Sequence, residues 1–421
     1  MKILWLTGAL LPETTAKIRN EKPQQWNTTG SWILNAAAML STQDDIQLFM
    51  AAPSQDVREL TRVETSRIVS YAIPYGKGPF VDCHGYDSYM QAIHDEIRPD
   101  IVHIHGTEYT HSLAYLRMWA KEQNAVISIQ GMTSVLHKYY RGGITLSEIL
   151  LNISFRDLIR GGILRTQLSF KKRGKYECEM LRLVSHVIGR TSWDYAHTKA
   201  INPALTYHWG GETLRKEYYA GRHWNYSECR RHSIFLSQSQ YSYKGLHQLL
   251  KALPLILRQY PDTTIRVAGT DPTLGYDRSQ WWRITGYGRY LMSLIKKLGV
   301  RQIIDFIGPK GPDDMIDELL QCNVFVIPSA IENSPNSLGE AQILGVPCVA
   351  SYVGGVMDMM IGNEANLYRY EEVEMLAEKV CNVFADKEKQ KDMSSIARER
   401  HDPERNMRSL IDTYHDIAGV K

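Results

Sequence analysis

Two glutamates in the second half of the chain lie on either side of the expected start of a helix. Glu332 and Glu340 follow the apolar run NVFVIP (323–328), and a helix is expected to begin between them, near Ser337. A loop that leads from a strand into a helix presents backbone N–H groups and the positive end of the helix dipole, which bind phosphate. Glu332 would face a neutral polyol, and Glu340 would accept two hydrogen bonds from a ribose diol. Each glutamate alone is also typical of a solvated surface.

The elements that would position these residues alternate regularly along the chain. Short apolar runs bounded by turn residues are separated by segments of helical periodicity, and the pattern restarts after an aromatic-rich stretch at 203–228. Such alternation is typical of βαβ units, whose parallel strands leave a ligand crevice at their carboxyl ends. We therefore expect an α/β protein with two doubly wound parallel-sheet domains. The runs are 2–8, 46–52, 101–106, 125–131 and 185–191, then 233–239, 264–270, 303–308, 323–329 and 347–351.

Composition excludes several other classes of protein. The chain has 421 residues, 43% of them hydrophobic, which suits two globular domains rather than disorder or a fibrous repeat. Its net charge of +3 is too small to indicate a nucleic-acid partner. The six cysteines form no C-x-x-C pair, so neither a zinc site nor a disulfide framework is expected. No run of 18 apolar residues occurs, and the N-terminus looks like a first strand, so we expect a cytoplasmic protein.

One segment, residues 135–182, departs from this pattern. It carries ten basic and four acidic residues, with large apolar side chains between them. Apolar and cationic side chains on one helical segment are what a protein needs to lie on an anionic bilayer. The same composition is equally compatible with a helical excursion that packs on its own domain and keeps a solvated basic edge.

The second half resembles a known family. The window PSAIENSPNSLGEAQILGVPCVASYVGG (328–355), with segments 240–256, 264–272 and 299–309, is similar to the C-terminal domain of the group 1 glycosyltransferases, family four of the retaining GT-B-fold enzymes. These enzymes include builders of bacterial polysaccharides and glycolipids. The first half resembles them more loosely, through its strand order and HIHGTE (103–108).

The resemblance implies a GT-B fold, in which two Rossmann-like domains face each other across a cleft. It places an acceptor-side domain at 1–210, which would include the excursion 135–182, and a linker at 211–228. A nucleotide-sugar-binding domain would follow at 229–400. The last segment, 401–421, would form a helix that returns to the first domain.

The resemblance also assigns roles to residues. Glu340 matches the ribose ligand, and Glu332 matches the carboxylate that contacts the hydroxyls of the donor sugar. Lys244 matches the lysine that neutralises the diphosphate, which gains negative charge as the anomeric C–O bond breaks. The backbone amides that meet the diphosphate would be those of Asn336, Ser337 and Leu338.

Two positions depart from the family pattern. Ser239 stands where the family carries an arginine on the diphosphate, and Gln130 stands where it often has a histidine near the acceptor. If a histidine approaches the reacting centre, His105 is the candidate, although a histidine satisfied at the sheet edge is an equal alternative.

Four further residues are expected near the nucleotide. Gly30 and Ser31 open a helix whose amides could approach the diphosphate, although a glycine there could simply start the helix. Gly269 could let the backbone approach the nucleotide closely. Lys310 follows the strand that lines the base pocket in the family.

We therefore expect a retaining glycosyltransferase that uses a nucleotide diphosphate sugar, UDP in preference to GDP, without metal or other cofactor. The acceptor would be a glycan or a lipid-linked sugar in surface polysaccharide assembly, and the protein could lie peripherally on the inner face of the cytoplasmic membrane. Two alternatives remain, namely a non-catalytic module that binds a nucleotide sugar or glycan, which Ser239 would favour, and a nucleotide-sugar epimerase of similar fold.

Overall fold

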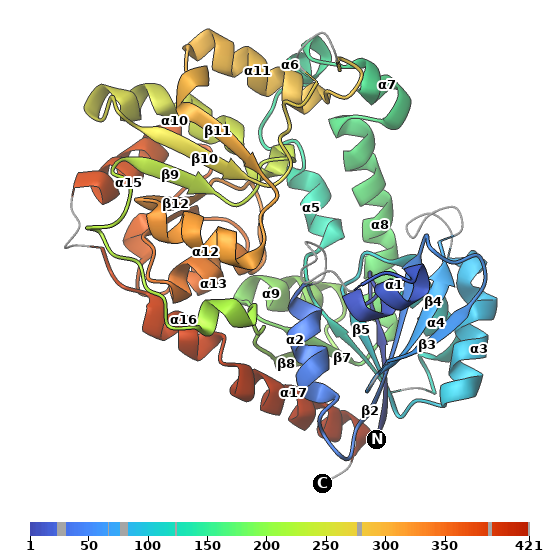
Figure 1. The fold of residues 1–421 in the computed structure, drawn as a ribbon. Coiled ribbons are helices and arrows are strands. Elements are labelled where there is room, and N and C mark those ends of the chain that lie inside the picture. The colour runs from blue at the N-terminus through green and yellow to red at the C-terminus, as the bar shows by residue number, and fades with distance from the viewer. Residues whose placement is uncertain are drawn as a thin grey trace. The chain divides into compact units, whose positions relative to one another are not determined.

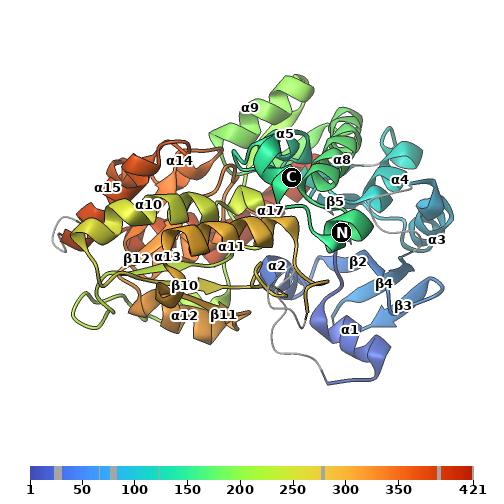
Figure 2. The ribbon, with the colours of Figure 1, turned by 90° about the horizontal axis from the view of Figure 1, so that it is seen from above.

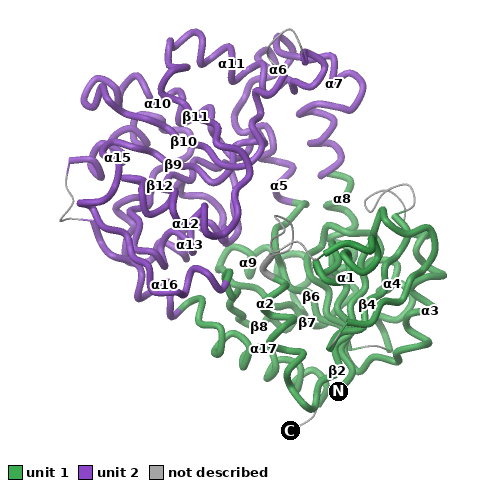
Figure 3. The backbone as a smooth tube through the Cα atoms, viewed as in Figure 1, with its two compact units in different colours: residues 1–134, 171–215, 400–421 green, residues 135–170, 216–399 purple. Residues whose placement is uncertain are grey.

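The computed structural model describes residues 1–22, 31–65, 67–75, 83–122, 124–275, 280–385 and 390–419. The chain divides into two compact units (Figure 3). The first comprises Met1–Ser134, Lys171–Arg215 and Arg400–Lys421, and the second comprises Val135–Phe170 and Lys216–Glu399. The C-terminal segment belongs to the first unit, whereas most of the excursion, Val135–Phe170, belongs to the second.

The first unit is built on an eight-stranded sheet in the order β3-β4-β2-β1-β5-β6-β7-β8. Every pairing is parallel except that of β3 with β4. The strands are β1 (Lys2–Leu6), β2 (Gln47–Ser54), β3 (Thr61–Glu64), β4 (Val69–Pro74), β5 (Ile101–His105), β6 (Ala125–Ser128), β7 (His186–Gly189) and β8 (Thr206–Trp209). The helices are α1 (Pro12–Arg19), α2 (Ser31–Leu40), α3 (Asp87–Ile97), α4 (Thr110–Trp119), α9 (Ser192–Ile201) and α17 (Pro403–Ala418).

The last helix, α17, completes the core of the first unit. Its regularly spaced apolar residues include Met407, Tyr414 and Ile417, which are buried with residues of β1 and of the neighbouring helix α2 (Figure 1). The Trp5 indole N–H donates to the Tyr414 hydroxyl at 2.9 Å. The periodicity of the C-terminal sequence thus identified a helix that packs on the first sheet.

The second unit contains a six-stranded parallel sheet in the order β11-β10-β9-β12-β13-β14. The strands are β9 (Ser233–Leu236), β10 (Thr264–Ala268), β11 (Ile304–Gly308), β12 (Val324–Ile327), β13 (Cys348–Ser351) and β14 (Leu367–Tyr368). The helices that follow them are α10 (Leu246–Gln259), α11 (Gly286–Leu298), α12 (Pro312–Gln321), α13 (Asn336–Ile343), α14 (Val356–Met359), α15 (Val373–Ala385) and α16 (Ser394–Arg400). Helices α10 and α15 lie side by side over one face of the sheet (Figures 1 and 2).

The strand order fixes where a ligand can bind in this unit. The chain proceeds from β9 outward through β10 and β11, and then returns to place β12 on the other side of β9. The connections after β9 and β12 therefore diverge, which leaves a crevice at their carboxyl ends. The loops 237–245 and 328–335 border this point.

The excursion packs on the rest of the second unit through both apolar and polar contacts. Its part in the second unit, Val135–Phe170, contains most of α5 (Thr133–Tyr139), α6 (Leu146–Leu151), α7 (Phe155–Arg160) and the first part of α8 (Ile163–Leu183). Ile144 and Ile149 are buried in the core of the second unit. The Gly142 carbonyl accepts a hydrogen bond from His247 Nε2 at 2.7 Å, and Asp157 Oδ2 accepts one from the Gly286 N–H at 2.8 Å. These contacts explain why the segment does not belong to the first unit.

His247, which donates to the Gly142 carbonyl of the excursion, should make the stability of the second unit depend on pH. Burial lowers the pKa of His247 to about 4, whereas an unfolded histidine titrates near 6.5. Between these values the unfolded chain binds a proton that the folded chain does not, so stability falls as the pH drops from 6.5 to 4. We expect His247→Gln to remove about 2–3 kcal/mol of this pH dependence, measured by urea denaturation at pH 7 and pH 4.5. His84→Gln, at an exposed histidine, is the control, and an unchanged slope in His247→Gln would contradict the assignment.

Candidate active site

Lys244 and Glu332, which come from the loops after β9 and β12, form an ion pair at the predicted crevice. Lys244 Nζ donates to Glu332 Oε1 at 2.7 Å, and their side chains are only 11% and 12% exposed. Ser329 Oγ donates to the same carboxylate oxygen at 2.7 Å. Two residues that the sequence selected separately are therefore in direct contact, and Glu332 is not a solvated loop residue.

Gly245 allows the two loops to approach each other. It has a φ of +76° and precedes α10. A Cβ atom at this position would lie 1.5 Å from the Pro328 carbonyl oxygen. The loops are also joined by a hydrogen bond of 2.7 Å from the Ala330 N–H to the Tyr243 carbonyl. Lys244 is thus held by backbone contacts on both sides.

A pair of adjacent glycines, Gly354 and Gly355, positions Glu332, a role that the sequence did not suggest. The Gly355 N–H donates to the Glu332 carbonyl at 3.1 Å. Gly354 has a φ of +52°, and a Cβ there would lie 1.8 Å from the same carbonyl oxygen. The adjacent glycines directly after β13 were the signal that could have identified this contact.

Helix α13 directs its amino end toward the same loop. Asn336 and Ser337 are its first two residues, and their N–H groups have no acceptor within the helix. Leu338 differs from its prediction, because it is buried and its N–H donates to the Pro335 carbonyl at 2.9 Å. The amides available for a phosphate are therefore those of Asn336 and Ser337.

Glu340 lies inside α13 and is 5% exposed. This burial excludes the solvated-surface interpretation of its role, because a carboxylate is rarely buried without a polar partner. Its place one turn from the helix start leaves the ribose-ligand hypothesis open.

Gly269 and Lys310 follow β10 and β11, which lie farther along the same sheet edge. Gly269 has a φ of +85°, and its N–H donates to the Gly308 carbonyl at 2.9 Å. Lys310 is partly exposed. No contact recorded for the described residues joins either one to the Lys244–Glu332 pair.

Ser239 is fully buried, and its hydroxyl has no hydrogen-bond partner among the described residues. An arginine could not occupy this position without burying its charge. We expect Ser239→Ala to leave the free energy of unfolding unchanged or raise it by about 1 kcal/mol, since it removes an unpaired buried hydroxyl. Ser239→Arg should lower it by about 3 kcal/mol or more. Urea denaturation measures both, and a marked loss in Ser239→Ala would show that the hydroxyl has a partner.

His105 and Gln130 line one small cavity of the first unit, with a volume of about 70 Å³. The His105 ring is buried and stacks on His103, with 3.9 Å between the ring centroids. Burial lowers the pKa of His105 well below its ordinary range. A neutral, buried ring fits a sheet-edge histidine better than a group that exchanges protons.

The same cavity contains the buried ion pair of Arg190 and Glu212, which the sequence analysis did not identify.

Of the two predicted residues at the start of α2, Gly30 lies outside the described residues. Ser31 is the first residue of that helix.

Residues 230–400 match the sequence model of the family "Glycosyl transferases group 1". Residues 230–400 belong to this family. The matched stretch contains Lys244, Glu332, α13 and every strand of the second sheet. The group 1 domain therefore corresponds to most of the second unit, as its sequence motifs predicted.

Curated relatives match the chain over part of its length. D-inositol 3-phosphate glycosyltransferase of Corynebacterium urealyticum is 26% identical over 180 residues, which cover 41% of this chain and 40% of that protein. Glycogen synthase of Mycobacterium tuberculosis is 26% identical over 134 residues, which cover 32% of this chain and 29% of that protein. The similarity to these relatives thus spans 40% of their length or less.

Solved structures match over the whole chain. Sucrose-phosphate synthase from Thermosynechococcus elongatus has a TM-score of 0.67 and 15% identity over 99% of both chains. Anabaena HepE, solved with UDP-glucose, has a TM-score of 0.63 and 15% identity over 99% of this chain and 100% of that one. These likenesses show that the group 1 domain is part of a GT-B fold.

Proposed function

We propose that this protein is a retaining glycosyltransferase that moves a sugar from a nucleotide diphosphate sugar to an acceptor hydroxyl. The observation that supports it most directly is the Lys244–Glu332 pair at the switch point of the second sheet. A cation, two helix amides and a carboxylate at one crevice match the needs of a diphosphate attached to a sugar.

In the proposed reaction the diphosphate is bound by the amides of Asn336 and Ser337, and its charge is balanced by Lys244. Glu332 then accepts hydrogen bonds from hydroxyls of the donor sugar, and Glu340 accepts them from the ribose. The bond from the anomeric carbon to the phosphate oxygen breaks while the acceptor oxygen bonds to the same face of that carbon. The acceptor proton passes to the departing phosphate oxygen, so the configuration is retained. Because Lys244 and the amides supply the counter-charge, this scheme uses no metal ion.

The donor is proposed to carry uridine. HepE, which shares the fold, was solved with UDP and with UDP-glucose. A thermal-shift panel of UDP, GDP and their sugars tests this choice, because a ligand at 100 times its dissociation constant adds about 2.7 kcal/mol of stability. Stabilisation by UDP and slow hydrolysis of one UDP-sugar are expected. A protein that binds no nucleotide diphosphate would contradict the proposal.

The acceptor is proposed to be a glycan or a lipid-linked sugar in surface polysaccharide assembly, held mainly by the first unit, at the inner face of the cytoplasmic membrane. The support for the membrane location is a surface of α6 and α7, in the second unit, that carries exposed apolar residues beside Arg156 and Arg160. These residues are Leu146, Leu150, Leu151, Phe155, Leu158 and Ile159, which are 47–79% exposed. None of the helices in the described part of the chain is both long and apolar enough to cross a bilayer.

Flotation with anionic vesicles at low salt tests the membrane proposal. The full chain should float, and the double variant Leu151→Ser/Leu158→Ser should float much less, because each change removes an exposed apolar side chain. A wild-type protein that stays with the soluble fraction would contradict it.

Product analysis separates transfer from its two alternatives. A non-catalytic module would bind UDP-sugars without hydrolysis or transfer, and an epimerase would change the configuration of the sugar without releasing UDP. Release of UDP that rises when an acceptor is added would support transfer.

A further inference from the structure

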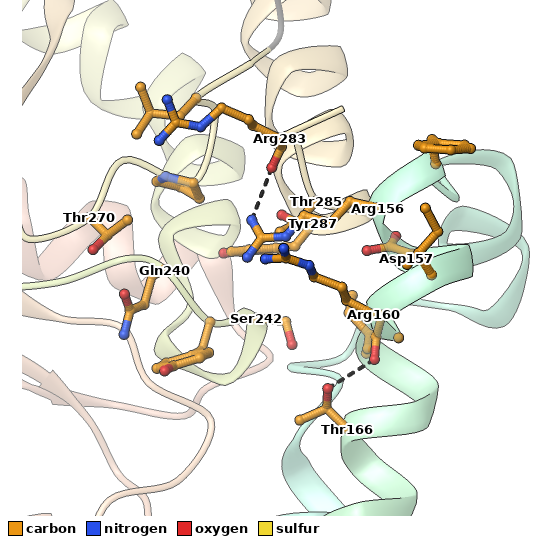
Figure 4. Close-up of a pocket in the computed structure, with 18 of the residues that line it drawn as sticks. Arg156, Asp157, Arg160, Thr166, Gln240, Ser242, Thr270, Arg283, Thr285 and Tyr287 are labelled. Atoms are coloured by element: carbon orange, nitrogen blue, oxygen red, sulfur yellow. Dashed lines mark hydrogen bonds between the residues drawn. The ribbon is translucent and has the colours of Figure 1, made fainter. Parts of the chain in front are cut away.

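A large cavity lies within the second unit beside the proposed donor site. Its volume is about 840 Å³, and its walls come from the excursion, from the loops after β9 and β10, and from the start of α11 (Figure 4). Gln240, Tyr241 and Ser242, which line it, belong to the loop that also carries Lys244. The cavity and the proposed diphosphate site therefore share one loop. None of the residues assigned to the donor lines the cavity.

The cavity is cationic. Arg156 and Arg160 extend into it from α7, and Arg283 lines its opposite wall (Figure 4). None of these three arginines forms an ion pair with any of the residues that the structure describes. Arg156 donates to the Arg283 carbonyl at 2.9 Å, which orients it but leaves its charge unbalanced.

The two carboxylates of the lining do not neutralise the arginines. Asp157 Oδ2 accepts hydrogen bonds from the Ser154 and Gly286 N–H groups, at 3.2 and 2.8 Å. Asp271 Oδ1 accepts from the N–H and hydroxyl of Thr273, at 2.7 and 2.6 Å. Within the described residues, neither aspartate forms an ion pair with any of these three arginines, so the guanidinium groups remain available to an anion.

Aromatic side chains complete the lining. Tyr241 and Trp282 are 41% and 52% exposed, whereas Tyr140 and Tyr287 are buried. Exposed aromatic faces suit the C–H faces of a sugar ring, and planar arginines suit phosphate. The volume is within the range that holds a small organic ligand.

We propose that this cavity binds a phosphate-bearing sugar, with Arg156 and Arg160 as its phosphate ligands. Such a site would bind its ligand whether or not the proposed transfer takes place. The excursion would thus give the group 1 domain a second anion site, separate from the one at Lys244.

Binding to the full chain, measured by isothermal titration calorimetry, tests the site. The probes are the 6-phosphates of glucose, fructose and mannose, the free hexoses, and octyl phosphate. At least one hexose 6-phosphate should bind ten or more times more tightly than its free hexose. Arg160→Gln should weaken that binding at least fivefold, whereas Lys297→Gln, at an exposed lysine of α11 outside the cavity, should leave it unchanged. Tighter binding of octyl phosphate than of any sugar phosphate would assign the phosphate to a lipid and overturn the free-sugar form.

The affinity for UDP, measured on the same samples, separates the two proposals. Arg160→Gln should leave it within twofold of the wild type. An equal loss of UDP and sugar phosphate binding would place the arginines in the donor site and overturn the inference. The absence of any preference for phosphate over the neutral hexose would also overturn it. If phosphate binds as expected but no donor sugar is transferred, the proposed function fails while the site remains.

Discussion

Lys244→Gln should lower the rate of glycosyl transfer about 100- to 1,000-fold, the loss typical when one preorganised stabilising group is removed from developing charge. The variant keeps a polar side chain, one atom shorter, but removes the cation that Glu332 and the proposed diphosphate share. UDP release with a saturating donor gives the rate, and calorimetry gives the affinity for UDP. Lys297→Gln is the control, because it removes a lysine of the same unit far along α11. A change of less than fivefold would remove Lys244 from the proposed mechanism.

Lys244→Gln should weaken the binding of UDP, whereas replacement of its partner Glu332 should strengthen it. Without ligand, Glu332 accepts from Lys244 Nζ at 2.7 Å, and the pair is mostly buried. A bound diphosphate must compete with that carboxylate for the cation. Glu332→Gln should therefore raise the affinity for UDP severalfold while it lowers transfer, since the amide no longer holds the lysine. Parallel loss of UDP binding in both variants would mean that Glu332 only maintains the loop.

Gly245→Ala should destabilise the second unit by about 3 to 5 kcal/mol, the largest stability effect that we expect from a single methyl group. Its Cβ would lie 1.5 Å from the Pro328 carbonyl oxygen, and the backbone has a φ of +76°. The two loops of the site would have to separate, so UDP binding should also be lost at temperatures where the variant is folded.

Gly299→Ala is the control that separates the cost of a positive φ from the cost of the steric overlap with Pro328. Gly299 ends α11 with a φ of +67°, but nothing lies within 4 Å of an added Cβ. It should lose only about 1 kcal/mol, the cost of the backbone conformation alone. Urea denaturation measures both variants. Equal losses would show that the contact with Pro328 is relieved by a small shift.

The sequence predicted the sheets and the central pair of the site well, because both depend on local patterns. Apolar runs of five to seven residues identified ten of the fourteen described strands but missed β3, β4, β8 and β14. The motif around Lys244 and Glu332 identified two loops that the strand order brings together. The role of Leu338 was mispredicted, since whether an amide faces outward depends on how the first turn closes on Pro335. The burial of His105 depends on Trp5 and His103, whose contact with it no spacing reveals.

The excursion shows a different limit. Its apolar residues indicated burial, and its basic residues indicated a charged surface, but neither pattern specifies which core receives Ile144 and Ile149. That choice depends on partners about 100 residues later, such as His247 and Gly286. Only the folded chain reveals it.

This arrangement also affects synthesis. Ile149 leaves the ribosome long before α11, which ends at Leu298 and belongs to the core that will bury it. At 5–20 residues per second the delay is about 7 to 30 seconds. During that time the nascent chain presents an unburied amphipathic segment at residues 135–170. A gene fragment that starts after Arg215 would encode a domain without part of its own interior.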